Sequence, residues 1–309
     1  MNKDNNIYHS DDEIEIKELF QIIWRKKIFI FFITSIFAVS SVVYSLLLPN
    51  IYTSSTLLSP SSQKESLSSS LEGLSGLASF AGVSIPKGSI SKSQIAIKRI
   101  QSHDFFSKHF LPNIKLENLM AVQKWEPISN SIFYDKKIFD IESKSWVRTV
   151  SFPKSIKPSS QEAFKEFKKI LNVEESKETG LVHISIKHQS PYVAKKWIDI
   201  IVYNINESMR SIDINDAQNS IDFLNNTATN IKIQSIKEVV SKLLERQMQT
   251  LMLASSSEDY VFKTINSSIV PEEKSGPNRS LICIMGTLIG AFVSMIISFI
   301  QYFRKLEQR

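Results

Sequence analysis

Residue types that commonly carry chemistry occur in this chain, but they do not form a recognised catalytic pattern. The 309-residue sequence has five histidines, and it contains no His-Glu-x-x-His, Gly-x-Ser-x-Gly or Gly-x-x-x-x-Gly-Lys-[Ser/Thr] motif. His183 and His188 lie five residues apart, a spacing that could hold a metal ion, although surface positions for both are favoured. We therefore predict no metal site, no cofactor and no catalysis.

Two further groups of side chains could bind a ligand. Trp125, Tyr134 and Trp146 could stack on sugar rings, although packing in a core or between subunits is favoured. A cluster of glutamates is mixed with lysines, which predicts a solvated loop. Its members are Glu174, Glu175 and Glu178.

Charge and cysteine content exclude some classes of partner and cross-link. The net charge is +6, but no dense basic run is interleaved with aromatic residues, so we expect no nucleic-acid partner. The one cysteine, Cys283, lies in an apolar run near the C-terminus. The polar middle of the chain therefore has no disulfide, and its stability must come from a packed core or from association.

Two apolar runs near the ends of the chain predict membrane helices. Ile28–Leu48 and Leu281–Ile300 contain no charged residue. Each is about 20 residues long, which is the length that spans a hydrocarbon core as a helix. The alternative is a buried core helix, which the absence of charge and the composition disfavour.

Basic residues beside the two runs predict the orientation. They are Arg25, Lys26, Lys27, Arg304, Lys305 and Arg309. Because short basic flanks stay in the cytoplasm, residues 1–27 and 301–309 are expected inside the cell and residues 49–280 outside it. A capping-box spacing that begins at Ser10 also predicts an amphipathic helix over Asp12–Lys27 on the inner membrane face.

The middle of the chain predicts a mixed α+β domain. Strands are expected at Ile51–Leu58, Val182–Lys187 and Tyr260–Ile265. Helices are expected at Ser89–Phe110 and Gln161–Leu171, with an irregular stretch between them. A mobile loop is expected in the Ser- and Gly-rich stretch from Ser59 to Pro86.

A long helical hairpin is the most distinctive prediction for this domain. Apolar residues recur every three or four positions over Pro191–Thr229, and a shorter helix is expected at Ile236–Leu253. The stripe includes Ile198, Ile201, Ile205, Met209 and Ile212. We predict a stalk over residues 191–253, on a base of residues 49–190 and 254–280. The stripe could pack against neighbouring copies, which we favour, or against the protein's own base.

Small residues line one face of the second apolar run. Gly286, Gly290 and Ser294 follow each other at four-residue steps, and Ser298 extends the series. This spacing permits close helix approach, and the expected partner is the first run. The facing residues would be Ala38, Ser41 and Ser45. A lipid-facing surface with no fixed partner is the alternative.

Several short motifs, in this order and spacing, resemble those of the Wzz-type polysaccharide chain-length determinants. At the N-terminal end they are Leu19-Phe20, Trp24-Arg25, Leu46-Leu47-Leu48-Pro49 and Tyr52. Further along they are the Gly-rich Leu71–Ala81, Trp146-Val147-Arg148 and Ser190–Trp197. A proline segment with Pro271 and Pro277 precedes the second run.

The resemblance implies a polysaccharide co-polymerase of the bacterial inner membrane with a periplasmic domain. Such proteins form homo-oligomeric rings and set the length of O-antigen chains, which grow on a lipid carrier. A separate Wzy-type polymerase forms the bonds, and membrane lipid surrounds the spans. A related class carries a cytoplasmic tyrosine kinase, which this sequence lacks because it has no phosphate loop.

Other functions stay open at this point. The chain could regulate another surface polysaccharide, either a capsule or an exopolysaccharide. A two-span receptor is less favoured, because about nine residues follow the second run and a receptor would need an output domain. An anchored extracytoplasmic enzyme would need a convergent acid/base pair in a closed pocket.

Overall fold

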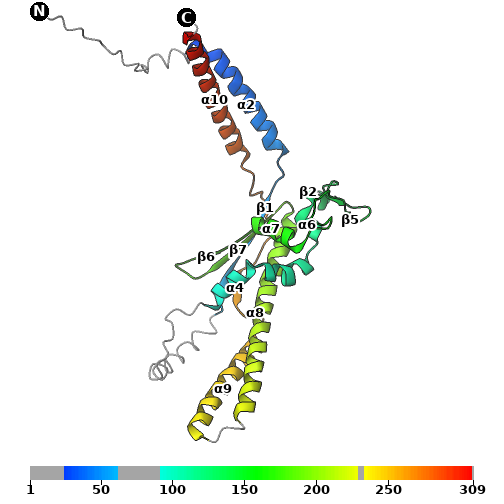
Figure 1. Cartoon of the computed structure of the whole chain (residues 1–309), viewed down its shortest axis with the longest axis vertical. Coiled ribbons are helices and arrows are strands. Elements are labelled where there is room, and N and C mark those ends of the chain that lie inside the picture. Colours follow the sequence, from blue (N-terminus) through cyan, green and yellow to red (C-terminus); the bar gives the residue numbers. More distant parts are fainter. Residues whose placement is uncertain (1–23, 62–90, 229–232, 308–309) are drawn as a thin grey trace, which may run out of the picture. The chain divides into compact units, whose positions relative to one another are not determined.

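The computed structural model describes residues 24–61, 91–228 and 233–307, and these form two compact units (Figure 1). The first unit comprises the described residues up to Asn50 together with those from Gly276 onward. The second comprises Ile51–Ser275. Most of the predicted N-terminal helix, most of the predicted Ser- and Gly-rich loop and the hairpin tip lie outside the described residues.

The first unit is a pair of packed apolar helices, α2 (Lys27–Leu47) and α10 (Arg279–Glu307). Both are long and apolar enough to cross a membrane. In a bilayer an α-helix satisfies its backbone polar groups internally, which suits these runs of Ile, Phe, Leu and Val. The second predicted span falls within α10, and the first coincides with α2 except for Leu48, which follows the end of the helix.

The second unit is built on a four-stranded antiparallel sheet in the order β6-β7-β1-β8. Its strands are β1 (Tyr52–Pro60), β6 (Leu171–Glu175), β7 (Val182–His188) and β8 (Phe262–Asn266). Tyr52 lies opposite His188 and Leu58 opposite Val182, so the strand after the first span is central. The three predicted strands are confirmed. The fourth, β6, replaces the predicted solvated loop at Glu174 and Glu175.

The core lies where α8 (Pro191–Ala228) crosses the sheet and meets the shorter helices. An aromatic cluster fills it, with Phe110 contacting Phe167 and Trp197 at ring-centroid distances of 4.5 and 5.7 Å. All three side chains are essentially fully buried. Burial of aromatic surface on this scale is a dominant source of stability.

One predicted helix is broken into shorter pieces. Ser89–Phe110 was expected to be continuous, but α4 (Lys92–Ile100) ends before Ser102, and α5 (His103–Phe105) starts a new turn. A π turn (Phe106–Phe110) and a 3-10 turn (Leu111–Asn113) follow. The Ser102 side chain accepts a hydrogen bond from the Phe105 amide, so it caps a new helix start.

The stretch predicted to be irregular contains a short helix and two small hairpins. After α6 (Leu116–Met120), β2 (Val122–Glu126) pairs with β3 (Ser131–Tyr134), and β4 (Phe139–Asp140) pairs with β5 (Ser145–Trp146). Each turn places one non-glycine residue at positive φ, Asn130 at 48° and Lys144 at 50°. Neither turn carries the glycine that usually marks a hairpin, so the sequence pattern did not reveal them.

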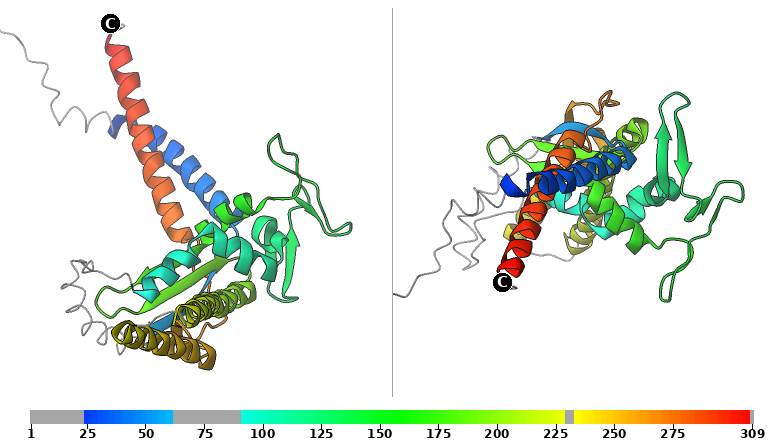
Figure 2. Two further views of the ribbon diagram at one scale, coloured as in Figure 1. Left: turned by 60° about the horizontal axis from the view of Figure 1, so that its bottom comes forward. Right: turned by 90° about the horizontal axis from the view of Figure 1, so that it is seen from above.

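The other predicted helices are confirmed with small changes in their bounds. α7 (Ser160–Ile170) begins with a capping box between Ser159 and Glu162. α9 (Gln234–Ser256) packs beside the far part of α8, as Figures 1 and 2 both show. Val240 of α9, together with Ala217 and Ile221 of α8, is buried in this hairpin.

Candidate anchoring and assembly sites

The two apolar helices approach each other closely at two glycines of α10. A Cβ added at Gly286 would lie 2.8 Å from the Ser41 hydroxyl oxygen and closer still to the Ser41 Cβ. A Cβ at Gly290 would lie 2.5 Å from the Cβ of Phe37 and 3.4 Å from the Cα of Thr34. Real Cβ atoms do not approach this closely, so only glycine fits at this helix separation.

The small-residue face differs in detail from the predicted one. Gly286 meets the expected Ser41, whereas Gly290 meets Phe37 and Thr34, which sequence reasoning did not select. Ser45, Ser294 and Ser298 are buried, and Ala38 is half-buried. The large Phe37 ring shows that the glycine makes room for a bulky neighbour rather than for another small residue.

Polar residues hold both ends of this helix pair. The Lys26 ammonium donates to the Gln301 side-chain oxygen at 2.7 Å. At the other end Arg279 donates to the Asn50 side-chain oxygen at 3.1 Å and, more weakly, to the Leu48 carbonyl at 3.5 Å. The antiparallel alignment is thereby fixed at two places more than 20 residues apart along α2.

The predicted proline segment contains a serine that is hydrogen-bonded to the start of the second unit. Ser275 lies between Pro271 and Pro277, and its amide donates to the Ile51 carbonyl at 2.8 Å. Its hydroxyl shares a 2.7 Å hydrogen bond with that of Thr53. The chain therefore leaves this unit directly beside the place where it enters.

The apolar stripe of α8 is largely covered by the protein's own base. Ile198, Ile201, Ile205 and Met209 are buried in the core cluster, and Ile212 is half-buried. Packing on the base was the alternative to packing against neighbouring copies. The burial of these residues therefore requires no second subunit.

A polar residue inside the same stripe joins α8 to β8. The carboxamide oxygen of Asn206 accepts from the backbone amides of Val261 and Phe262, both at 2.9 Å. Its nitrogen donates to the Phe262 carbonyl at 2.9 Å. Asn206 is only 5% exposed, so these bonds satisfy backbone groups shielded from water. Nothing in the sequence pattern distinguished this asparagine from a surface one.

The two histidines considered as metal ligands, His183 and His188, differ in their exposure to solvent. His183 is exposed, as predicted, but His188 is buried, so its predicted surface position is wrong. The His188 Nδ1 accepts from the Ser190 amide at 2.9 Å, and Nε2 lies 2.9 Å from the Asn118 carbonyl. Burial lowers the pKa of His188, which favours the neutral ring in this structural role. Among the described residues, no group of three or more His, Cys, Asp or Glu side chains could hold a metal ion.

The aromatic residues considered for sugar stacking make internal contacts. Trp125 packs edge-on against Tyr52 at 5.4 Å, and Trp146 packs against Phe139 at 5.1 Å. The Tyr134 hydroxyl lies 2.6 Å from the side-chain oxygen of Asn118. These contacts account for the aromatic residues through packing.

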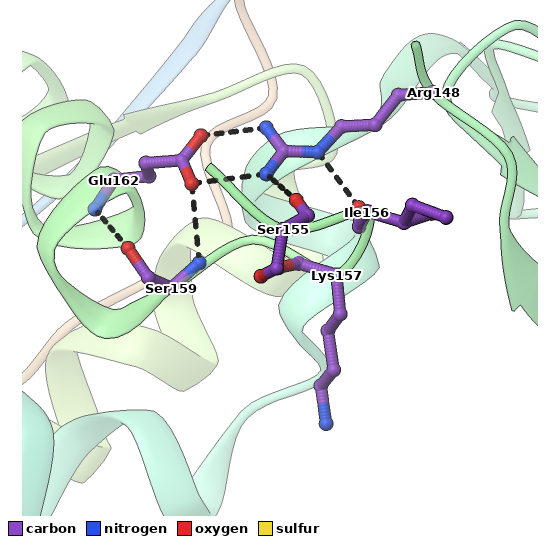
Figure 3. Close-up of polar contacts among 6 residues, drawn as sticks. All are labelled: Arg148, Ser155, Ile156, Lys157, Ser159 and Glu162. Carbon is purple, nitrogen blue, oxygen red and sulfur yellow. Dashed lines mark hydrogen bonds and ion pairs between the residues drawn. The ribbon is translucent and has the colours of Figure 1, made fainter. Parts of the chain in front are cut away.

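An ion pair clamps the segment that precedes α7 (Figure 3). The Arg148 guanidinium binds both carboxylate oxygens of Glu162, at 2.6 and 3.0 Å. It also donates to the backbone carbonyls of Ser155 and Ile156, each at 2.8 Å. The pKa of Glu162 is lowered from 4.5 to about 2, chiefly because its carboxylate accepts hydrogen bonds from the Arg148 side chain. Arg148 thus holds the chain seven and eight residues further on, at Ser155 and Ile156, close to its own side chain.

Part of the chain matches a known protein family. Residues 12–110 match the family described as Wzz, chain length determinant protein. The match covers 99 of the 309 residues. The matched residues contain the first span and the central strand β1, which are the N-terminal features on which the predicted resemblance depended.

Solved structures similar to this chain have related names. One, a full-length bacterial polysaccharide co-polymerase, shares 12% identity over 94% of this chain and 98% of its own, with a TM-score of 0.40. Another is a fragment of WzzB, a polysaccharide co-polymerase from Salmonella Typhimurium. It shares 14% identity over 74% of this chain and 100% of its own, with a TM-score of 0.32. Comparison with curated proteins finds no match.

Proposed function

We propose that this protein is a non-enzymatic regulator of O-antigen chain length in the bacterial inner membrane. In this proposal α2 and α10 span the bilayer, both termini are cytoplasmic and residues 49–280 form the periplasmic domain. The observation that carries it is the Wzz match, which begins before the first of two apolar helices at opposite ends of the chain. The basic residues beside each helix support the orientation.

The proposed mechanism is geometric rather than chemical. A homo-oligomeric ring holds a Wzy-type polymerase and the growing lipid-linked polysaccharide together, and the ring's geometry biases when elongation stops. The polymerase forms the bonds, so the regulator needs no catalytic group. The sequence is consistent with this division, because it carries no phosphate loop and no nucleophile motif.

The ring needs a surface between copies, and the hairpin offers one. The base covers most of the α8 stripe, whereas α9 has a row of exposed apolar residues that a neighbour could cover. Ile236, Val239 and Leu243 are 39–57% exposed and follow one another at helical spacing. An isolated helical hairpin with such a face gains stability by packing against another copy.

Deleting the gene and reading the lipopolysaccharide ladder on a gel tests the proposed function. We expect O-antigen chains to remain but to lose their preferred length, and a plasmid copy of the gene to restore it. Complete loss of the chains would instead indicate a polymerase. An unchanged ladder would contradict an O-antigen role, and loss of length control in a capsule or exopolysaccharide would transfer the proposal to that polymer.

A further inference from the structure

One exposed loop combines apolar side chains with a fixed conformation. We call residues 149–157, which connect β5 to α7, the Phe152 loop. Every residue from Ser151 to Lys157 is exposed, and Phe152 is 97% exposed. Ile156 is 57% exposed. Large apolar side chains displayed in this way mark surfaces that bind a partner.

Hydrogen bonds hold the part of the loop that carries Ile156. Arg148 holds the carbonyls of Ser155 and Ile156 while it is itself held by Glu162 (Figure 3). The Ser155 hydroxyl donates to the Lys157 carbonyl at 2.6 Å. The backbone that carries Ile156 therefore has defined hydrogen-bond partners, while the Ile156 side chain stays exposed.

The charge around the loop has one sign. No acidic residue occurs between Ser143 and Gln161, whereas this interval contains Lys144, Arg148, Lys154 and Lys157. Glu162 neutralises Arg148, so three lysines remain to set the local charge. An apolar tip flanked by lysines is complementary to a lipid surface with anionic headgroups, which attract basic residues near the membrane.

Within the second unit, the loop is held by a helix that also lies beside Ile51, the residue at which the chain enters this unit. Ile51 lines a cleft together with Glu166 and Lys169 of α7. Glu162, which holds the loop, lies one helical turn, or about 6 Å, before Glu166. Ile51 follows Leu48, the C-terminal cap of α2, by three residues, which reach at most about 11 Å.

We propose that the Phe152 loop docks on an anionic lipid surface, with Phe152 and Ile156 entering the interface and Lys154 and Lys157 lying near the phosphates. The inference rests on the proposed insertion of α2 and α10 in a bilayer. It adds a third membrane contact, which would restrict the tilt of the periplasmic domain. In a ring of subunits, such a restriction would set the angle between neighbouring copies.

Depth measurements by spin labelling test this proposal on the full chain. Cys283 is replaced by Ser, and a nitroxide is attached at Phe152→Cys in vesicles of phosphatidylethanolamine and phosphatidylglycerol. We expect this label to collide more with oxygen, which partitions into lipid, than with a water-soluble nickel chelate. A label at Phe223→Cys, which is 68% exposed on α8, serves as the water-facing control.

A third label, at Phe292→Cys on the exposed side of α10, separates the possible failures. If Phe292 reports lipid and Phe152 reports water, the loop inference is overturned and the proposed function stands. If both report water, the proposed membrane insertion fails as well. A Phe152 label shielded from both reagents would indicate contact with a second copy or another protein and would overturn lipid docking.

The charge requirement has its own test. Replacing phosphatidylglycerol by phosphatidylcholine, or combining Lys154→Gln with Lys157→Gln, should move the Phe152 label toward water. A matched pair, Lys165→Gln with Lys168→Gln on α7, removes the same charge outside the loop and should leave the label's depth unchanged. Equal depth with and without anionic lipid would overturn the assignment of the lysines to headgroups.

Discussion

Replacing Glu162 by Gln tests the clamp that fixes the chain before α7. Arg148 and Glu162 pair through two hydrogen bonds, and their side chains are only 15% and 18% exposed. Glutamine keeps the shape of glutamate and can still complete the capping box with Ser159. The substitution therefore removes the charge and little else.

The pKa of Glu162 sets the size of the expected effect. One pKa unit corresponds to about 1.36 kcal/mol, so the fall from 4.5 to about 2 gives an upper limit of about 3 kcal/mol. Solvent screens the interaction because the pair is partly exposed, so the expected loss in the free energy of unfolding is about 1–2 kcal/mol at neutral pH. The loss should appear as a lower melting temperature of the second unit.

The pH dependence follows from the direction of the pKa change. Because the folded-state pKa is depressed, the stabilisation is complete above pH 4.5 and is lost as the pH falls toward 2. The difference between parent and E162Q should therefore be largest near pH 7 and vanish near pH 2. Thermal unfolding of the detergent-solubilised full chain, followed by tryptophan fluorescence over this range, measures it.

Glu166→Gln provides the matched control on the same helix. Glu166 pairs with Lys169, but these side chains are 40% and 67% exposed, so its loss should cost less than about 0.5 kcal/mol. Equal destabilisation by the two substitutions at pH 7 would refute the special role of the clamp. A difference between parent and E162Q that did not change between pH 7 and pH 2 would refute its electrostatic origin.

Three further variants, one of them a double substitution, test the packing within the two units. Gly286→Leu combined with Gly290→Leu should force the apolar helices apart and broaden the glycan length distribution on gels at normal protein levels, since even a Cβ does not fit at either site. Asn206→Ala leaves three buried backbone groups without their hydrogen-bond partner, at a cost of about 1–3 kcal/mol each. It should lower the free energy of unfolding by about 3 kcal/mol or more, which would appear as a lower melting temperature. Ile201→Ala removes a fully buried side chain and should cost about 2–5 kcal/mol, read from the same melting curves.

Exposed neighbours supply the controls for these substitutions. Leu288→Ala on α10 and Tyr203→Ala on α8 change large side chains that are 49% and 69% exposed. Neither should reproduce the effects at the glycines or at Ile201. An unchanged ladder in the double glycine variant would argue against close helix packing in length control, and a wild-type melting curve for Asn206→Ala would mean that its hydrogen bonds add nothing to stability.

Periodic patterns made much of the fold predictable. The spans followed from uncharged apolar runs, α7 from its capping box, and β7 from strict alternation over Val182–Lys187. In each case a local signal and the tertiary environment agree, so a short window of sequence was sufficient. The long helix α8 begins at the predicted Pro191 and is helical up to Ala228, the last described residue before the hairpin tip.

The elements that were missed depend on interactions between distant residues or on unusual backbone conformations. β6 is polar and lies at the edge of the sheet, where pairing with β7 rather than composition makes it a strand. The two small hairpins turn through Asn130 and Lys144 at positive φ. His188 carries no mark of burial in its sequence, because its partners at Asn118 and Ser190 come together only in the fold.

The burial of the α8 stripe changes where the surface between copies should be sought. A pattern of apolar residues shows that a face must be covered, but it does not show by what. Here the base covers Ile198–Met209, so substitutions there would act on the stability of each subunit and only indirectly on assembly. The exposed face of α9 should behave differently. Val239→Ser should leave the melting temperature of the subunit unchanged and weaken the proposed association between copies. Comparing these two classes of variant would separate length control by subunit contacts from loss of length control through misfolding.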